Sequence, residues 1–143
     1  MIITNEDNME LMKRYEDNHF DLAIVDPPYG IDVTKMDMGG RKRNAGDKKK
    51  EWDDGVPTAD YFKELFRVSK NQVIWGGNYF DLPPSQYFAI WDKAETMYGR
   101  SFAECEYAWV RSGGTRIFKK NPNQLDRIRP TQKHTKLSEF ILM

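Results

Sequence analysis

The stretch that decides the fold is Leu22-Ala23-Ile24-Val25-Asp26-Pro27-Pro28-Tyr29-Gly30. Its first four residues are a continuous apolar run, too short for a helix, and they predict a buried strand. The two prolines have no N–H for a sheet ladder and keep the residue before them extended, so the strand should end at Asp26. The pattern predicts a carboxylate and an aromatic ring at the carboxyl end of a central strand, where open α/β sheets bind their ligands.

This strand ending suits one kind of ligand. Asp26 and the carbonyl of Pro27 can both accept hydrogen bonds from one exocyclic amino group, and the Tyr29 ring offers a face to a flat base. The same residues also occur as a plain strand-ending turn, and a short motif alone does not separate the two interpretations. The other segments of the chain have to decide between them.

Composition limits the class of protein. The 143 residues are enough for one domain with a sizeable core. The 22 basic and 22 acidic side chains give a net charge of zero, so overall charge neither favours nor excludes nucleic acid. The single cysteine excludes an internal disulfide and a cysteine-rich zinc site. With no apolar run long enough for a signal or a membrane span, we expect a cytoplasmic protein without membrane contact.

The rest of the chain alternates between helical and extended patterns. Asn5-Glu6-Asp7 should cap a short helix, and the apolar spacing after Pro57-Thr58 predicts an amphipathic helix that Asn71 ends. Such alternation is typical of an α/β fold with a partly parallel sheet. The expected helices cover about 9–15 and 58–70, and the expected strands lie at 2–3, 22–25, 72–75 and 87–91.

Glycines mark two further features. Residues 103–110 and 115–118 predict the arms of a hairpin joined by a turn at Gly113-Gly114. Cys105, in the first arm, is expected to be a small buried apolar side chain. Gly76-Gly77 follows the 72–75 strand and should permit close approach of a ligand or a neighbouring loop.

A segment from Ile31 to Val56 has no hydrophobic period and is rich in basic residues. Its basic side chains form either a solvated face or, because they follow the Asp26 motif directly, a surface that reaches phosphates. We favour the second interpretation, and we expect base-reading residues in the loops at 32–55 and 112–129. The candidate DNA-binding residues are Lys35, Arg41, Lys42, Arg43, Lys48, Lys49 and Lys50.

Together these segments resemble the amino-group DNA methyltransferases, which move the methyl group of S-adenosylmethionine onto the exocyclic nitrogen of adenine or cytosine. Asp26-Pro27-Pro28-Tyr29 is similar to their catalytic DPPY motif, and residues 74–80, 90–93 and 102–109 look like further family segments in the family's order. Residues 129–133 resemble the HPTQKP motif at the cofactor site, with Arg129 in place of the usual His. The cofactor-binding residues that the resemblance implies are Asp7, Asp26, Pro130, Thr131, Gln132 and Lys133.

The motif order resembles the β subclass of this family. It implies a three-layer Rossmann-like methyltransferase fold with a mixed sheet over residues 1–143, expected to be incomplete because the family's glycine-rich cofactor loop has no match. It also implies that Asp26, Pro27, Pro28 and Tyr29 act on a base flipped from double-stranded DNA, with adenine N6 preferred over cytosine N4 and no metal. The alternatives are a truncated relative that binds DNA without methylating it, a split enzyme completed by a second copy or another chain, and methylation of a protein amide or of RNA.

Overall fold

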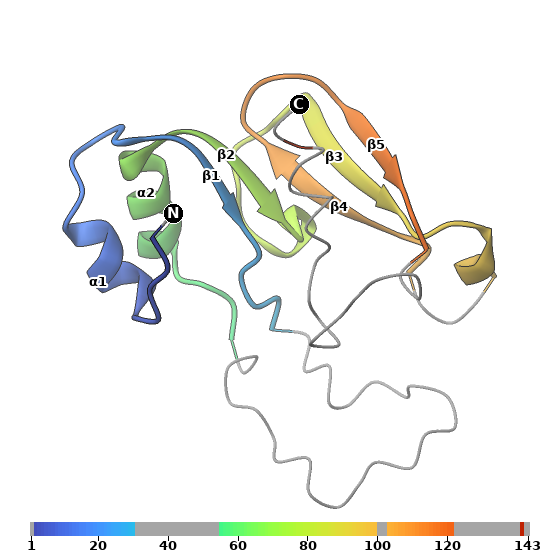
Figure 1. Cartoon of the computed structure of the whole chain (residues 1–143), viewed down its shortest axis with the longest axis horizontal. Helices are drawn as coiled ribbons and strands as arrows, with labels where there is room; N and C mark the ends of the chain where they lie inside the picture. The colour runs from blue at the N-terminus through green and yellow to red at the C-terminus, as the bar shows by residue number, and fades with distance from the viewer. Residues whose placement is uncertain (1, 31–54, 100–102, 122–140, 142–143) are drawn as a thin grey trace, which may run out of the picture.

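The structure is a computed structural model, and it describes residues 2–30, 55–99, 103–121 and residue 141. This part of the chain forms one mixed sheet with two α-helices (Figure 1). The helices are α1 (Asn8–Lys13) and α2 (Ala59–Val68), and two short 3₁₀ turns are η3 (Gly77–Tyr79) and η4 (Glu95–Met97). The strands are β1 (Phe20–Val25), β2 (Ser69–Trp75), β3 (Tyr87–Asp92), β4 (Cys105–Val110) and β5 (Arg116–Lys119).

The order of strands in the sheet is β1-β2-β4-β3-β5. β1 and β2 are parallel, with α2 between them in the chain, and β3 and β5 are also parallel. β4 runs antiparallel to both of its neighbours. The predicted α/β class with a partly parallel sheet is therefore confirmed. Within the described ranges no helix is long and apolar enough to cross a membrane.

Both helices begin where the sequence predicts. The Asp7 carboxylate caps α1, because its Oδ1 accepts from the backbone N–H groups of Met9 and Glu10 at 2.9 and 3.1 Å. The Thr58 hydroxyl caps α2 by accepting from the N–H of Tyr61. α2 ends at Val68 and the chain enters β2 without a loop, so the helix ends three residues before the expected break at Asn71.

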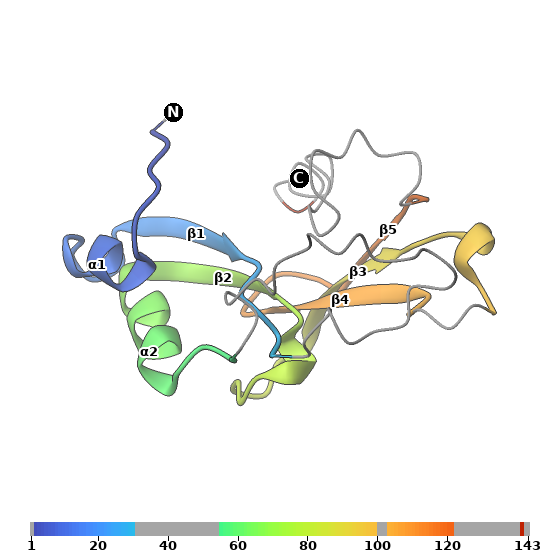
Figure 2. The same ribbon diagram turned by 90° about the horizontal axis from the view of Figure 1, so that it is seen from below.

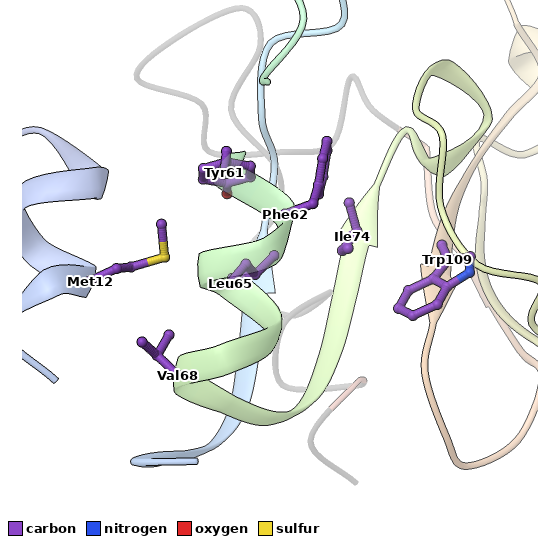
Figure 3. Close-up of a cluster of buried hydrophobic side chains, with 7 residues drawn as sticks. All are labelled: Met12, Tyr61, Phe62, Leu65, Val68, Ile74 and Trp109. Carbon is purple, nitrogen blue, oxygen red and sulfur yellow. The ribbon is translucent and has the colours of Figure 1, made fainter. Parts of the chain in front are cut away.

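Alternating side chains of the strands build two apolar layers, one on each face of the sheet. Figure 2 shows α2 on one side of β1 and β2, and Figure 3 shows how this helix presents its apolar stripe to Ile74 of β2. The cluster on this face comprises Met12, Tyr61, Phe62, Leu65, Val68, Ile74 and Trp109. The cluster on the second face comprises Val73, Trp75, Ala89, Trp91, Ala108 and Val110.

α1 and α2 cover only the first of these faces. On the second face, Leu22, Ile24, Tyr87, Phe118 and Ile141 pack at the margin of the cluster. The described residues thus form a sheet with one helical layer, and the predicted third layer is not among them.

The predicted hairpin of 103–110 and 115–118 is wrong in its pairing. Both strands exist, but β3 lies between them: β4 pairs with one edge of β3 and β5 with the other. The connection from Arg111 to Thr115 crosses the beginning of β3, where the Thr115 hydroxyl accepts from the N–H of Phe88. Five extended residues can span two strand spacings, so the glycines serve a crossover rather than a tight turn.

Two smaller expectations are also wrong. Ile2 and Ile3 lie outside any strand and are 88% and 81% exposed, since a run of two apolar residues buries too little surface to hold a strand. Cys105 is exposed because β4 enters the core only from its fourth residue onward.

Candidate functional site

The candidate site lies along the edge of the sheet that is formed by strand ends, where β1, β2 and β3 end and β4 begins. In the parallel β1–β2 pair Val25 is opposite Ile74, so Asp26 and Gly76 both follow directly at this edge. The N–H of Gly76 donates to the carbonyl oxygen of Tyr107 at 3.0 Å, and Trp91 is opposite Glu106. Segments from four separate parts of the sequence therefore meet at one edge, the place where α/β sheets bind ligands.

Asp26 and Tyr29 are held together at this edge. Asp26 is exposed, Pro27 is buried beneath it, and the Tyr29 hydroxyl donates a hydrogen bond of 2.7 Å to Asp26 Oδ1. The prolines leave the segment little backbone freedom, so the carboxylate and the ring keep a fixed relation. A carboxylate offers about four lone-pair positions, so Asp26 can accept from further donors while it holds Tyr29.

An aromatic cluster surrounds the Tyr29 ring. Tyr79 stacks on it with ring centroids 4.9 Å apart and planes inclined by 12°, and Phe80 meets its edge at 6.1 Å. Phe80 in turn packs against Phe62 of the core at 5.1 Å. The face of Tyr29 on which we expected a base to stack is therefore partly covered by Tyr79. The sequence did not predict this contact.

Gly76 makes this packing possible. Its φ of +68° is the left-handed conformation that favours glycine. A Cβ built on Gly76 would lie 2.3 Å from Cε1 of Tyr29 and 2.6 to 2.7 Å from the two adjoining ring carbons. The expected close approach at this glycine is confirmed, and the partner is the Tyr29 loop.

A partly buried ion pair completes the site. Lys93 Nζ lies 2.9 Å from Glu106 Oε1, with side chains only 13% and 28% exposed, and the same ammonium stands over the Trp91 ring at 5.7 Å. Neither residue was predicted as a site residue. Lys93 follows β3 and Glu106 belongs to β4, so only the register between these strands brings them together.

Burial and the nearby carboxylates of Asp26 and Glu106 raise the pKa of Tyr29 well above its usual range. The Tyr29 hydroxyl is consequently protonated at neutral pH and acts as a hydrogen-bond donor to Asp26. The edge therefore presents two carboxylates and one ammonium beside a pair of stacked aromatic rings.

The remaining predicted site residues fare differently. Asp7 is described and exposed, and its visible role is to cap α1. Of the predicted 112–129 loop, residues 112–121 are described and include β5, whose Arg116 and Lys119 are exposed. The predicted cofactor residues Pro130, Thr131, Gln132 and Lys133 lie outside the described residues. The candidate DNA-binding residues Lys35, Arg41, Lys42, Arg43, Lys48, Lys49 and Lys50 lie outside them as well.

Comparisons of the chain with protein-family models, with curated proteins and with solved structures found no match.

Proposed function

We propose that this chain is an S-adenosylmethionine-dependent methyltransferase that acts on the exocyclic amino group of a nucleic-acid base, adenine N6 in preference to cytosine N4. One observation carries the proposal: the Asp26 motif and the three described segments that also resemble the family come to the same end of the sheet. Residues 76–80, 92–93 and 104–107, far apart in sequence, all lie toward the end of the sheet at which β1 and β2 finish, with Tyr107 bonded directly to Gly76 and residues 92–93 and 104–105 further out along β3 and β4. A plain strand-ending turn gives no reason for this convergence.

The roles follow from the chemistry of each group. Asp26 and the Pro27 carbonyl accept hydrogen bonds from the target amino group, which keeps electron density on the nitrogen and stabilises positive charge as it develops. Tyr29 stacks on the base and orients it. The Tyr29 hydroxyl fixes the Asp26 carboxylate at 2.7 Å, so the acceptor is already oriented. The base has to leave the duplex stack to reach this edge, since its amino group is otherwise inaccessible.

S-adenosylmethionine would supply an electrophilic methyl group on its sulfonium. The described side chains suit the polar groups of this cofactor, because the exposed carboxylates of Asp7 and Asp26 accept hydrogen bonds from amino and hydroxyl groups. Oδ1 of Asp7 already accepts the two hydrogen bonds that cap α1. A hydrogen bond from the cofactor would therefore go to Oδ2 of Asp7.

Transfer of a labelled methyl group to adenine-containing DNA tests the proposal, with mass spectrometry to identify the methylated base. Asp26→Asn keeps the shape of the side chain but removes its charge, and it should lower the rate by about 10²-fold or more. Asp21→Asn is the matched control, because Asp21 is an exposed aspartate of β1, the strand that leads to Asp26, and its described interaction is an ion pair with Lys70. Equal turnover by both variants would sink the assignment of Asp26.

A second candidate function uses the same base site without turnover by this chain alone. β1 lies at an edge of the described sheet, although its sequence is apolar toward both faces as in an interior parallel strand. That observation favours a nucleic-acid-binding chain whose cofactor site is completed by a second polypeptide. Calorimetric titration of S-adenosylmethionine into the purified, folded chain separates the two candidates: saturable one-site binding favours the enzyme, and no binding favours the chain that needs a partner.

A further inference from the structure

We propose that Tyr79 is a second stacking residue of the base site: its ring lies on Tyr29 in the free protein and moves to take one side of the bound base. The inference rests on the proposed function and adds a residue to it.

The stacking geometry supports this role. Stacked aromatic rings have their planes about 3.5 Å apart, so the centroid distance of 4.9 Å implies that the Tyr79 and Tyr29 rings are offset laterally by about 3.4 Å. In an offset pair the two rings overlap only in part. The two rings are inclined by only 12°, so Tyr79 presents the face of its ring to Tyr29, which is the kind of contact that a flat base would make with it.

The backbone that carries Tyr79 is fixed. A Cβ on Gly77 would come within 2.6 Å of Trp109 Cβ, so this turn is pressed against β4. The N–H of Tyr79 donates to the carbonyl oxygen of Gly76 at 2.9 Å, and the following Phe80 is anchored on Phe62 in the core. Rotation of the Tyr79 side chain is therefore the way in which the stack can open.

The Tyr79 ring is free to make that rotation. Tyr79 is 44% exposed to solvent, whereas Tyr29 is half-buried. A buried aromatic would lose core packing when it moved, whereas the one ring contact of Tyr79 among the described residues is that with Tyr29. Stacking of a base on an aromatic ring is at least as favourable as a contact between two tyrosines, so a base can replace that contact.

A fluorescent oligonucleotide tests the inference without turnover. The probe is a single strand of thymidines with one 2-aminopurine, whose fluorescence falls when the base stacks and whose base needs no flipping. We expect quenching by the wild-type chain, about tenfold weaker binding by Tyr79→Ala, and affinity within twofold of wild type for Tyr79→Phe, which keeps the ring. Asp26→Asn reports on the base site itself and should also weaken binding.

The outcomes distinguish the inference from the proposed function. Quenching that depends on Asp26 but is unchanged or strengthened by Tyr79→Ala would overturn the role of Tyr79 and leave the base site standing. Binding of the probe, seen by fluorescence polarisation, without quenching by the wild-type chain would overturn both. Tyr98→Ala, which removes another exposed tyrosine outside the cluster, should match wild type; a loss as large as that of Tyr79→Ala would refute a specific role.

Discussion

Gly76 offers the sharpest test of how the site is built, because a second glycine provides a matched control. Gly76 and Gly99 both have a φ of +68°, so alanine is strained equally at either position. Among the described residues nothing lies within 4 Å of a Cβ at Gly99, whereas a Cβ at Gly76 would lie 2.3 Å from the Tyr29 ring. The difference between the two alanine variants therefore isolates the contact with Tyr29.

The magnitudes follow from the geometry. The left-handed backbone costs an alanine about 1–2 kcal/mol at either position. In Gly76→Ala the Tyr29 ring has to retreat by about 1.1 Å to reach the 3.4 Å at which ordinary contact begins. Such overpacking adds about 1–3 kcal/mol. The retreat also displaces the Tyr29 hydroxyl, which should weaken its 2.7 Å hydrogen bond to Asp26.

Urea denaturation measures both variants, and a double-mutant cycle completes the test. We expect Gly99→Ala to lose only the backbone contribution and Gly76→Ala to lose more. In a Tyr29→Ala background, Gly76→Ala should cost no more than Gly99→Ala, because the ring it meets is gone, which gives a coupling free energy of about 1–3 kcal/mol. Equal losses for the two glycine variants in the wild-type background, or no coupling to Tyr29, would refute this account of the site.

Three further predictions concern other contacts. Asp7→Ala should lower the unfolding free energy by about 1 kcal/mol and Asp7→Asn by much less, since asparagine also caps helices; a loss of S-adenosylmethionine affinity in Asp7→Asn without a loss of stability would reveal a cofactor contact. Lys93→Met and Glu106→Gln should each cost about 1–3 kcal/mol in urea denaturation because each removes one partner of a partly buried ion pair, and the double variant should cost less than their sum. The Tyr98 hydroxyl donates to the Asp92 carboxylate and holds the pKa of this carboxyl below its usual value. The hydrogen bond therefore stabilises the fold at pH values above the ordinary aspartate pKa, and this stabilisation is lost as the pH falls through the lowered pKa of Asp92. Tyr98→Phe should raise the pKa of Asp92 in an NMR titration, and it should destabilise the protein at pH 7 but not near pH 2.

Local sequence was sufficient for the elements that carry Asp26. The prolines fix the end of β1 whatever surrounds it, the capping groups of Asp7 and Thr58 act within their own helices, and the apolar stripe of α2 has one way to face a sheet. These features depend on neighbours within a few residues, so periodicity and capping rules predict them.

Contacts that depend on strand register were not predictable in the same way. Lys93 meets Glu106 because Trp91 is opposite Glu106, and β5 lies beyond β3 because Ala89 is opposite Arg116. A glycine-containing connection is compatible with a return to the preceding strand or with a crossover, and the choice depends on which strand offers an unpaired edge. The stack of Tyr29 and Tyr79 likewise depends on the parallel pairing of β1 with β2.

The position of β1 allows the proposed base site to be tested apart from the proposed cofactor site. Every described contact of the base site, from the Asp26 and Tyr29 hydrogen bond to the Lys93 and Glu106 ion pair, comes from β1 or from the strands on its β2 side. The opposite edge of β1 contributes to none of them. Because the base site is assembled on one side of β1, base stacking should persist in a chain that requires a further strand to bind the cofactor. A quenched oligonucleotide together with absent cofactor binding would therefore identify a chain that recognises bases but depends on a partner for methyl transfer.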